Sequence, residues 1–506
     1  MNSSVESPSA RELIALTLDA GSFSSWDVRL PLLPIEESYA DELERARQRS
    51  HEDEAVVTGE GAINGRRVAV IVGEFAFLGG SIGVNAAERI VSAISRATSQ
   101  GIPILAAPIS GGTRMQEGTT AFLQMVKITE AVSKHKAAHL PYLVYLRNPT
   151  TGGVFASWGS LGHITVAQTG ALIGFLGPKV YRALRGDDFP AGVQTAENLY
   201  RHGIVDAVLD PKRLRHVAGD ALAIMQSTPS TERDSHPESW PETAAPDAWT
   251  SIEISRRTDR PGLRSLLHYA ASSTVRLSGT GQGESNKTSV VSLATLGGHG
   301  VVVVGFDRRA QFDLELGPDA LRQARRGMAL AAELQMPLIT VIDTPGAALS
   351  REAEEGGLGG EIARCLADLI TLPVPTVSVI LGEGTGGGAL ALIPADRVIA
   401  ARNGWLAPLP PEGASVIRFG SIDRAQEMAE TQRVRSADLL DDGIVDQIVE
   451  EQPSADIEPA EFCRRLGRAI VAHLDELTTS DQANRQMLRA NKYQTLGRRN
   501  VIALSL

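Results

Sequence analysis

The chain alternates short apolar runs with longer segments in which apolar residues recur at helical spacing. Residues 67–72 and 301–305 are rich in valine and predict strands buried on both faces. Further strands are predicted by the apolar runs that directly follow Pro103, Pro141, Pro337 and Pro375. Helices are predicted over residues 86–99, 116–136, 320–333 and 462–474. Buried strands that alternate with helices are typical of crossover units in a mainly parallel α/β sheet.

The spacing of these elements repeats along the chain. Pro103 and Pro337 are 234 positions apart, and Pro141 and Pro375 are separated by the same distance. The Thr-Gly-Gly sequence at residues 151–153 also returns 234 positions later. Chance recurrence would not keep both the order and the spacing of these markers. We therefore interpret the chain as two homologous halves.

A segment between the halves differs in composition from both. Residues 226–248 are rich in Ser, Pro, Thr and acidic residues, and they offer little apolar surface to bury. This composition favours an exposed linker. We expect a first domain over residues 1–225, a linker over residues 226–248 and a second domain over residues 249–506.

Composition narrows the class of protein. The 506 residues carry a net charge of −11, which disfavours a protein that binds nucleic acid along its phosphates. Two cysteines, Cys365 and Cys463, cannot form a disulfide framework or a four-thiolate zinc site. The polar start predicts no secretory signal, and no apolar run is long enough to span a membrane. We expect a cytoplasmic protein that binds neither nucleic acid nor membrane.

Glycines gather where the predicted strands end. The clusters are Gly79-Gly80-Ser81, Gly111-Gly112, Gly152-Gly153, Gly346 and 382–389. Carboxyl ends of parallel strands are where such folds bind ligands, and adjacent glycines can aim two backbone N–H groups at one anion. A single cluster is explained as well by a tight turn. Clusters paired between two halves favour a binding site.

Competing motifs are weaker. Gly382, Gly384 and Gly387 fit the dinucleotide pattern, but no acidic residue for the ribose follows about 20 residues later. His163 lies in an apolar stretch, which is typical of a core histidine. Asp343 and Glu383 lie at strand ends, where either could cap a turn. The sequence therefore indicates no side chain as an obvious general base.

Longer motifs carry a family resemblance. Residues 110–118, 148–154 and 171–178 resemble the beta subunit of bacterial acetyl-CoA carboxylase carboxyltransferase. The sequences at 256–261, 343–347, 382–384, 387–391 and 411–415 resemble its alpha subunit. The match covers roughly residues 40–450, in the order beta half, then alpha half. The four-cysteine zinc ribbon that usually opens the beta subunit is missing, because no cysteine precedes Cys365.

The resemblance implies two crotonase-like (ClpP/crotonase) domains in tandem and an enzyme that moves CO2 from carboxybiotin to the alpha carbon of an acyl-CoA. The product would be malonyl-CoA or a homologue, as in fatty acid biosynthesis. Two backbone oxyanion holes would do the catalytic work, formed by Gly152 and Gly153 and by Gly387, Gly388 and Ala389. No metal is implied.

The same resemblance assigns the binding residues. The CoA would be held in the first half by Gly79, Gly80, Ser81, Gly111, Gly112 and Arg114. Biotin would enter near Gly346, Ala347 and Gly384, and Ala391 would lie near the acyl end of the pocket. A small residue at Ala391 fits a short or medium acyl chain.

The resemblance also implies partners. The chain has no Met-Lys-Met sequence for biotin attachment, so biotin would arrive on a biotin carboxyl carrier protein served by a biotin carboxylase, or on a fused alpha chain. The site of the family lies between the first half of one protomer and the second half of another, which implies a homo-oligomer, commonly a hexamer. Two alternatives remain at this stage: a malonyl-thioester or malonate decarboxylase subunit, and a non-catalytic assembly subunit of a carboxylase complex.

Overall fold

Two sheets organise the chain, and each belongs to its own unit. The structure, a computed structural model, describes residues 7–28, 36–227 and 246–497. The first unit comprises Met1–Ala223 and Leu277–Glu284, and the second comprises Ile224–Arg276 and Ser285–Leu506. Residues 228–245 of the predicted linker lie outside the described residues, and its bounds stay a prediction.

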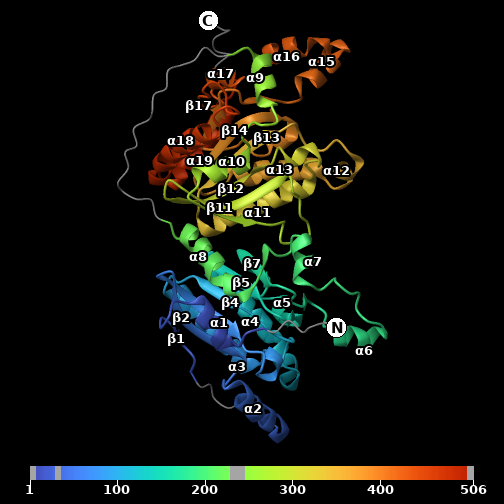
Figure 1. Ribbon diagram of the computed structural model, residues 1–506, viewed down its shortest axis with the longest axis vertical. Helices are drawn as coiled ribbons and strands as arrows, with labels where there is room; N and C mark the ends of the chain where they lie inside the picture. The colour runs from blue at the N-terminus through green and yellow to red at the C-terminus, as the bar shows by residue number, and fades with distance from the viewer. Residues whose placement is uncertain (1–6, 29–35, 228–245, 498–506) are drawn as a thin grey trace. The chain divides into compact units, whose positions relative to one another are not determined.

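The sheet of the first unit has the strand order β1-β2-β3-β4-β5-β7-β9 (Figure 1). These strands are β1 (Ser24–Ser25), β2 (Val56–Ile63), β3 (Arg66–Gly73), β4 (Ile104–Ala107), β5 (Tyr142–Leu146), β7 (Ile164–Gln168) and β9 (Ala207–Leu209). Strand β2 pairs antiparallel with β1 and β3, and the strands from β3 onward are parallel. A small parallel pair, β6 (Thr150–Thr151) and β8 (Ile173–Gly174), lies beyond the end of β5.

Helices cover both faces of this sheet. One face packs against α3 (Val84–Ser99) and α4 (Gly118–Ala137), with a core that includes Ile71, Ile90 and Ile128. Helix α1 (Ala10–Thr17) contacts β2 and β3, and α2 (Glu37–Ser50) packs beside the 3-10 turn η1 (Leu78–Gly80). The remaining helices are α5 (Gly152–Phe155), α6 (Pro178–Arg185), α7 (Ala196–Arg201) and α8 (Leu214–Met225).

The second unit repeats the plan with the strand order β10-β11-β12-β13-β14-β15-β17. The strands are β10 (Ser273–Leu277), β11 (Ser289–Leu296), β12 (His299–Phe306), β13 (Leu338–Thr344), β14 (Thr376–Thr385), β15 (Arg397–Ala401), β16 (Trp405–Ala407) and β17 (Gln447–Val449). Strand β16 pairs with the end of β14. The helices are α9 (Ala248–Ser255), α10 (Leu263–Ala270), α11 (Pro318–Leu334), α12 (Arg351–Glu355), α13 (Leu358–Ile370), α14 (Gly386–Leu390), α15 (Pro411–Phe419), α16 (Ala425–Thr431), α17 (Ser436–Asp441), α18 (Pro459–Thr479) and α19 (Gln482–Thr495).

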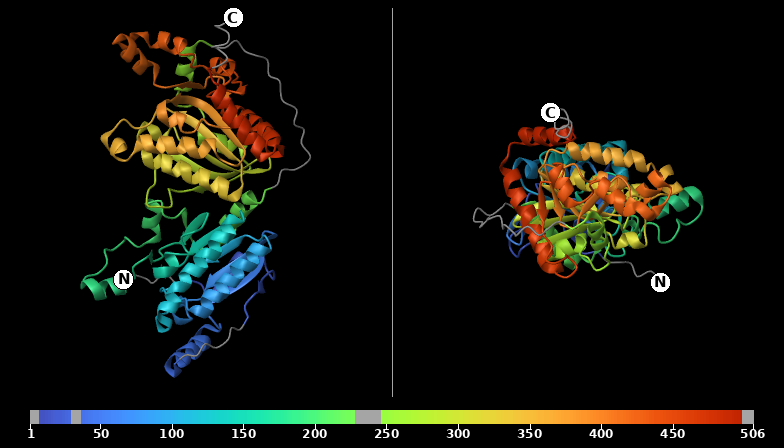
Figure 2. Two further views of the ribbon diagram at one scale, coloured as in Figure 1. Left: turned by 180° about the vertical axis from the view of Figure 1, so that it is seen from behind. Right: turned by 90° about the horizontal axis from the view of Figure 1, so that it is seen from above.

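The two faces of this sheet are also covered. Helix α11 packs on β11 and β12, and α18 packs with α10 and contacts β14, β15 and β17. Figure 2 shows α18, in red, lying along the sheet of the second unit. Cys365 on α13 and Cys463 on α18 are buried in this packing. No helix in residues 7–28, 36–227 and 246–497 is both long and apolar enough to cross a bilayer.

The repeat extends to single hydrogen bonds. In the first unit, Asp206 receives the Thr165 N–H on Oδ2 at 2.9 Å, and its own N–H donates to the Thr165 carbonyl at 2.7 Å. In the second unit, Asp446 makes the same two bonds with Val398, at 2.6 Å and 2.8 Å. Each aspartate therefore fixes the start of an equivalent strand, which supports the interpretation of two homologous halves.

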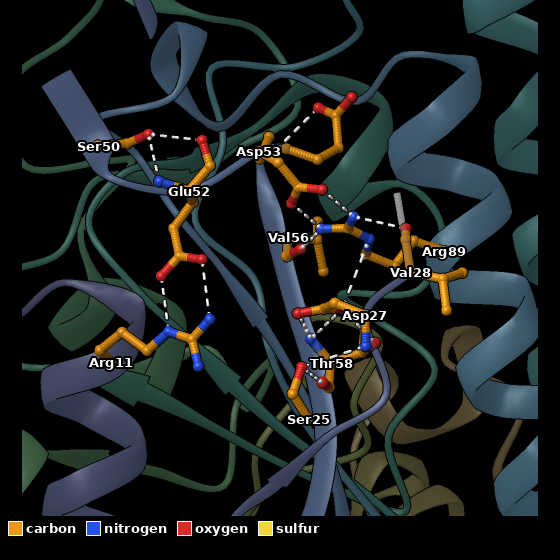
Figure 3. Close-up of polar contacts among 12 residues, drawn as sticks. Arg11, Ser25, Asp27, Val28, Ser50, Glu52, Asp53, Val56, Thr58 and Arg89 are labelled. Atoms are coloured by element: carbon orange, nitrogen blue, oxygen red, sulfur yellow. Dashed lines mark hydrogen bonds and ion pairs between the residues drawn. The ribbon is translucent and has the colours of Figure 1, made fainter. Parts of the chain in front are cut away.

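An ion cluster fixes the edge of the first sheet (Figure 3). Arg89 on α3 donates to both carboxylate oxygens of Asp53, at 2.8 Å and 2.9 Å, and its Nε lies 3.4 Å from Asp27. Asp27 also receives the Thr58 N–H at 3.0 Å. The cluster thus ties the segment that follows β1 to β2 and α3.

Candidate active site

Each half carries a turn built on one hydroxyl group. In the first, Ser110 Oγ receives the Gly112 N–H at 3.0 Å and lies 3.1 Å from the Gly112 carbonyl. In the second, Thr344 Oγ1 receives the Gly346 N–H at 3.1 Å and lies 3.1 Å from the Gly346 carbonyl. The φ angles of Gly112 and Gly346 are +123° and +131°, a region that residues with a Cβ rarely adopt. The same local conformation is thus built twice.

Next to the first turn, the short helix α5 begins at Gly152. A Cβ at Gly152 would lie 3.3 Å from Gly112 Cα, and one at Gly153 would lie 3.2 Å from Thr113 Oγ1. The Gly152 N–H donates to the Phe175 carbonyl at 3.0 Å, so this amide is already occupied. Gly153 lies in the first turn of α5, where an N–H has no acceptor within the helix. Gly153 is therefore the better of the two predicted donors.

The glycines before α3 adjoin the same turn. The Gly111 N–H donates to the Gly79 carbonyl at 2.9 Å, and the Ile82 N–H donates to the Gly112 carbonyl at 3.1 Å. A Cβ at Gly80 would overlap the Ile109 carbonyl oxygen, so this glycine permits the close approach. The structure thus brings the predicted residues Gly79, Gly80, Ser81, Gly111, Gly112, Gly152 and Gly153 together.

Arg114 has structural contacts that its motif does not reveal. Its guanidinium donates to Glu54 at 2.5 Å and 3.2 Å and to the Ser81 carbonyl at 2.8 Å. The side chain is 1% exposed. Burial opposes its charge, but Glu54 outweighs burial and raises the pKa of Arg114. Its donors thus tie the Ser81 segment to Glu54, and the expectation that Arg114 lines the CoA surface stays a prediction.

The second half places its glycines at the start of α14. A Cβ at Gly388 would lie 3.4 Å from Ala347 N and 3.6 Å from the Gly346 carbonyl carbon. Gly387 and Gly388 are in the first helical turn, where N–H groups lack intrahelical acceptors. Ala389 is one residue further on, where the N–H joins the helical ladder, and it is fully buried. Gly387 and Gly388 are thus the better donors in this half.

Two other predicted residues of this half lie inside the fold. Gly384 belongs to β14, and a Cβ there would lie 2.8 Å from the Trp405 carbonyl oxygen. Its absence of a side chain serves the β14–β16 pairing, and the expectation that biotin enters near Gly384 stays a prediction. Ala391 is fully buried at the end of α14.

An ion cluster that the motifs did not reveal lies behind the second turn. Arg308 Nη1 is 3.4 Å from Asp343 Oδ1, and its Nη2 is 3.3 Å from Glu383 Oε2. Because Asp343 lies near the end of β13 and Glu383 near the end of β14, Arg308 links the two strands whose loops carry the site. Arg256 joins Glu383, at 3.1 Å, to Glu412 on α15, at 2.6 Å. Arg256, Asp343, Glu383 and Glu412 belong to four separate motifs, which the fold brings into one network with Arg308.

Burial shifts the pKa of one member of this network. Desolvation, opposed by Arg308 and Arg260, raises the pKa of Asp343 to about 6. Among residues 7–28, 36–227 and 246–497, no group of three or more His, Cys, Asp and Glu side chains could hold a metal ion. His163 receives the Tyr142 N–H on Nδ1 at 3.0 Å and is buried, as predicted for a core histidine. The two turns therefore offer backbone N–H groups that can stabilise negative charge on an oxygen.

Comparison with known proteins identifies the family. The family model described as "Carboxyl transferase domain" matches residues 7–488. The chain belongs to the carboxyl transferase family. The resemblance found in the sequence is thereby confirmed.

Curated relatives of this carboxyl transferase match it along nearly its whole length. A protein of Mycobacterium tuberculosis named "Probable biotin-dependent acyl-coenzyme A carboxylase beta3 subunit" is 57% identical, over 95% of this chain and 97% of its own length. "Acetyl-coenzyme A carboxylase carboxyl transferase subunits beta/alpha" of Salinispora arenicola is 34% identical, over 96% of this chain and 90% of its own length.

Solved structures show the same fold. Transcarboxylase 12S, solved as a hexamer with methylmalonyl-coenzyme A and methylmalonic acid bound, has a TM-score of 0.72 at 21% identity, covering 94% of this chain and 90% of its own. A single-chain, multi-domain long-chain acyl-CoA carboxylase gives a TM-score of 0.68 at 18% identity, covering 92% of this chain and 46% of that one. The prediction of two crotonase-like domains is confirmed.

Proposed function

We propose that this carboxyl transferase is the component of a biotin-dependent acyl-CoA carboxylase that moves the carboxyl group from carboxybiotin to the alpha carbon of an acyl-CoA. The observation that carries the proposal is that the site is duplicated. In each half, the turn held by a Ser or Thr hydroxyl (the hydroxyl turn) packs next to a short helix that begins with glycines. The names of the curated relatives, biotin-dependent acyl-CoA and acetyl-CoA carboxylases, support the substrate class.

The chemistry explains why two backbone sites suffice. Removing a proton from the carbon beside a thioester places negative charge on the thioester oxygen. Carboxybiotin, when bound, would supply the carboxyl group, and the biotin left without it would carry negative charge on its ureido oxygen and could take up that proton. We assign the N–H of Gly153 to one of these oxygens and those of Gly387 and Gly388 to the other. Each N–H donor at such a site contributes roughly 10²–10³ in rate.

The acyl group and the product follow from the same assignment. Ala391 lies four residues beyond Gly387, whose carbonyl receives the Ala391 N–H at 3.0 Å. The resemblance places the acyl end of the pocket near this residue, and a small side chain at Ala391 fits a short or medium acyl chain, with malonyl-CoA as the product from acetyl-CoA. Gly79, Ser81 and Gly112 would face the CoA, and Gly346 and Ala347 would face biotin.

Apolar side chains around both glycine sites favour an assembly of copies of this chain. In the first unit, Phe122 and Val126 on α4 are 58% and 67% exposed, and Phe175 is 66% exposed. In the second, Leu349 and Leu390 are 98% and 47% exposed. Clustered apolar exposure of this kind marks protein interfaces. We propose a homo-oligomer, a hexamer as described for transcarboxylase 12S, in which a second copy covers each site.

The proposal is tested by purifying the chain with its native partners, probing for biotinylated protein and assaying carboxyl transfer from malonyl-CoA to biocytin. We expect a biotinylated carrier, a biotin carboxylase and biotin-dependent transfer. Release of CO2 without biotin would instead indicate a decarboxylase. A biotinylated partner without any transfer would indicate an assembly subunit.

The residue assignment is tested by Gly153→Ala. The added methyl group would lie 3.1 Å from the flexible Met125 side chain, which can move, so the fold should persist. The methyl group would also lie beside the Gly153 N–H and displace the substrate oxygen that this N–H is proposed to bind. We expect transfer to fall by roughly 10²-fold. Ala137→Val, at an exposed position near the far end of α4, is the control and should keep wild-type activity. Normal transfer by a folded Gly153→Ala protein would remove Gly153 from the site.

A further inference from the structure

The two hydroxyl turns, residues 110–112 and 344–346, differ in the hydrogen bonds that fix them to the rest of the fold. In the first half, the Gly111 N–H donates to the Gly79 carbonyl at 2.9 Å and fixes the residue between Ser110 and Gly112. In the second half, the equivalent residue is Pro345, and proline has no N–H to donate. The second turn therefore cannot make the backbone bond that holds the first.

A side chain takes its place. Gln311 lies on the 3-10 turn η4 (Ala310–Phe312), which follows β12. Its Nε2 donates to the Asp343 carbonyl at 3.1 Å, and its Oε1 receives the Thr344 hydroxyl proton at 2.6 Å. The orientation of the amide follows from its partners, because a carbonyl oxygen can only accept. Gln311 thus hydrogen-bonds both to the end of β13 and to the hydroxyl of the turn.

These two hydrogen bonds of Gln311 affect the neighbouring Gly346 N–H. The Thr344 hydroxyl has a single proton to donate. Its oxygen lies 2.6 Å from Gln311 Oε1 and 3.1 Å from the Gly346 carbonyl oxygen, so the shorter hydrogen bond goes to Gln311. The Thr344 oxygen then keeps its lone pairs for the Gly346 N–H. Ser110 in the first half makes both of its contacts to Gly112 instead.

We propose that Gln311 is a positioning residue of the second glycine site, acting through Thr344. The turn that it fixes contains Gly346 and Ala347, against which Gly388 packs at 3.4 Å to 3.6 Å, measured from the position of a Cβ. A shift of this turn therefore moves the surface beside the first N–H groups of α14. The inference rests on the proposed function, because the site that Gln311 positions is the proposed oxyanion site.

The test uses Gln311→Met, which removes both hydrogen bonds at similar volume. We expect kcat to fall roughly tenfold, as for loss of one net hydrogen bond in the transition state, with KM nearly unchanged. Thr344→Val and the double variant complete a cycle. If Gln311 acts through Thr344, the double variant is no slower than Thr344→Val alone. Gln48→Met, at an exposed position of helix α2, is the control and should match the wild type.

Hydrogen exchange of the Gly346 amide tests the positioning without any assay of transfer. In Gln311→Met we expect this amide to exchange several-fold faster while the unfolding midpoint is retained. Wild-type exchange and wild-type kcat in Gln311→Met would overturn the inference, and so would strictly additive effects with Thr344→Val. If the wild-type protein shows no transfer, the proposed function fails, and the exchange rate alone then decides whether Gln311 holds the turn.

Discussion

The carboxyl group of Asp343 is buried, with its side chain 4% exposed. Arg308 and Arg260 attract its charged form, and yet burial prevails and raises its pKa to about 6. Its Oδ1 receives the Glu383 N–H at 3.2 Å, so the acid joins two strand ends. The protonation of Asp343 therefore bears on both the stability of the second unit and the spacing of its loops.

The pH dependence of stability follows from this shift. A pKa raised from 3.8 to about 6 means that the folded protein binds the proton more tightly than the unfolded chain. The resulting stabilisation is complete below about pH 4 and is lost as the pH rises through 6. We expect the free energy of unfolding of wild type, relative to Asp343→Asn, to decrease by about 1–3 kcal/mol between pH 4 and pH 7.

Urea denaturation of both proteins across this pH range measures the difference. The Asp343→Asn variant keeps the size of the side chain and an oxygen acceptor for the Glu383 N–H, so it isolates the titration. A stability difference that stays constant with pH would show that Asp343 remains charged in the folded protein.

Single residues also mark the limit of prediction from sequence. The glycine clusters were found because glycine pairs at strand ends are rare and repeat at one spacing. The ion pair of Arg114 could not be predicted, because a motif gives the position of a charge but not its partner, and Glu54 lies 60 residues away. Gln311 belongs to no motif and could not be found, because its role depends on the missing N–H of Pro345.

At the scale of elements, a buried ion pair joins the segment before α10 to the residues after β17. Arg260 donates to both carboxylate oxygens of Glu451, at 2.7 Å and 2.6 Å. Glu451 also receives the N–H groups of Asn403 and Ala455, each at 3.0 Å. The side chains of the pair are 3% and 0% exposed. Each charge therefore depends on the other for its solvation.

Removing one partner should be costly. We expect Arg260→Met to lower the free energy of unfolding by about 3–5 kcal/mol, because it leaves a carboxylate buried without its cation. Arg260→Met combined with Glu451→Leu should recover part of this loss. Denaturant titration of the three proteins measures both effects. A loss below about 1 kcal/mol in Arg260→Met would mean that water reaches Glu451.

The elements that sequence predicted are those with apolar periodicity. The strands expected after the four prolines are β4, β5, β13 and β14. The helix predicted over residues 462–474 is α18 (Pro459–Thr479). The prediction is shorter than the helix because the end turns of α18 are polar and carry no apolar periodicity. Helix α19 was not predicted, since the residues that it buries are Arg485 and Arg489. Arg489 pairs with Asp396 at 2.8 Å, and no hydrophobic pattern reveals such a contact.

At the scale of the whole molecule, assembly is the property most open to test. The exposed apolar side chains of α4 lie on the helix that also contacts Gly153 through Met125. We expect Phe122→Asp combined with Val126→Asp to reduce the mass measured by light scattering and to abolish transfer. Ile457→Asp, at a position that is 64% exposed, is the control and should assemble normally. An unchanged mass in the double variant would exclude this face from the interface.

The buried sulfurs have a practical consequence. Burial raises the pKa of both Cys365 and Cys463 to about 12, so neither forms a thiolate at neutral pH. These are the only two cysteines of the sequence, and the native protein should therefore resist maleimide reagents. A thiol added on the surface, as in Ala137→Cys, would then react alone, which allows a single dye to report on this protein without first removing its own cysteines.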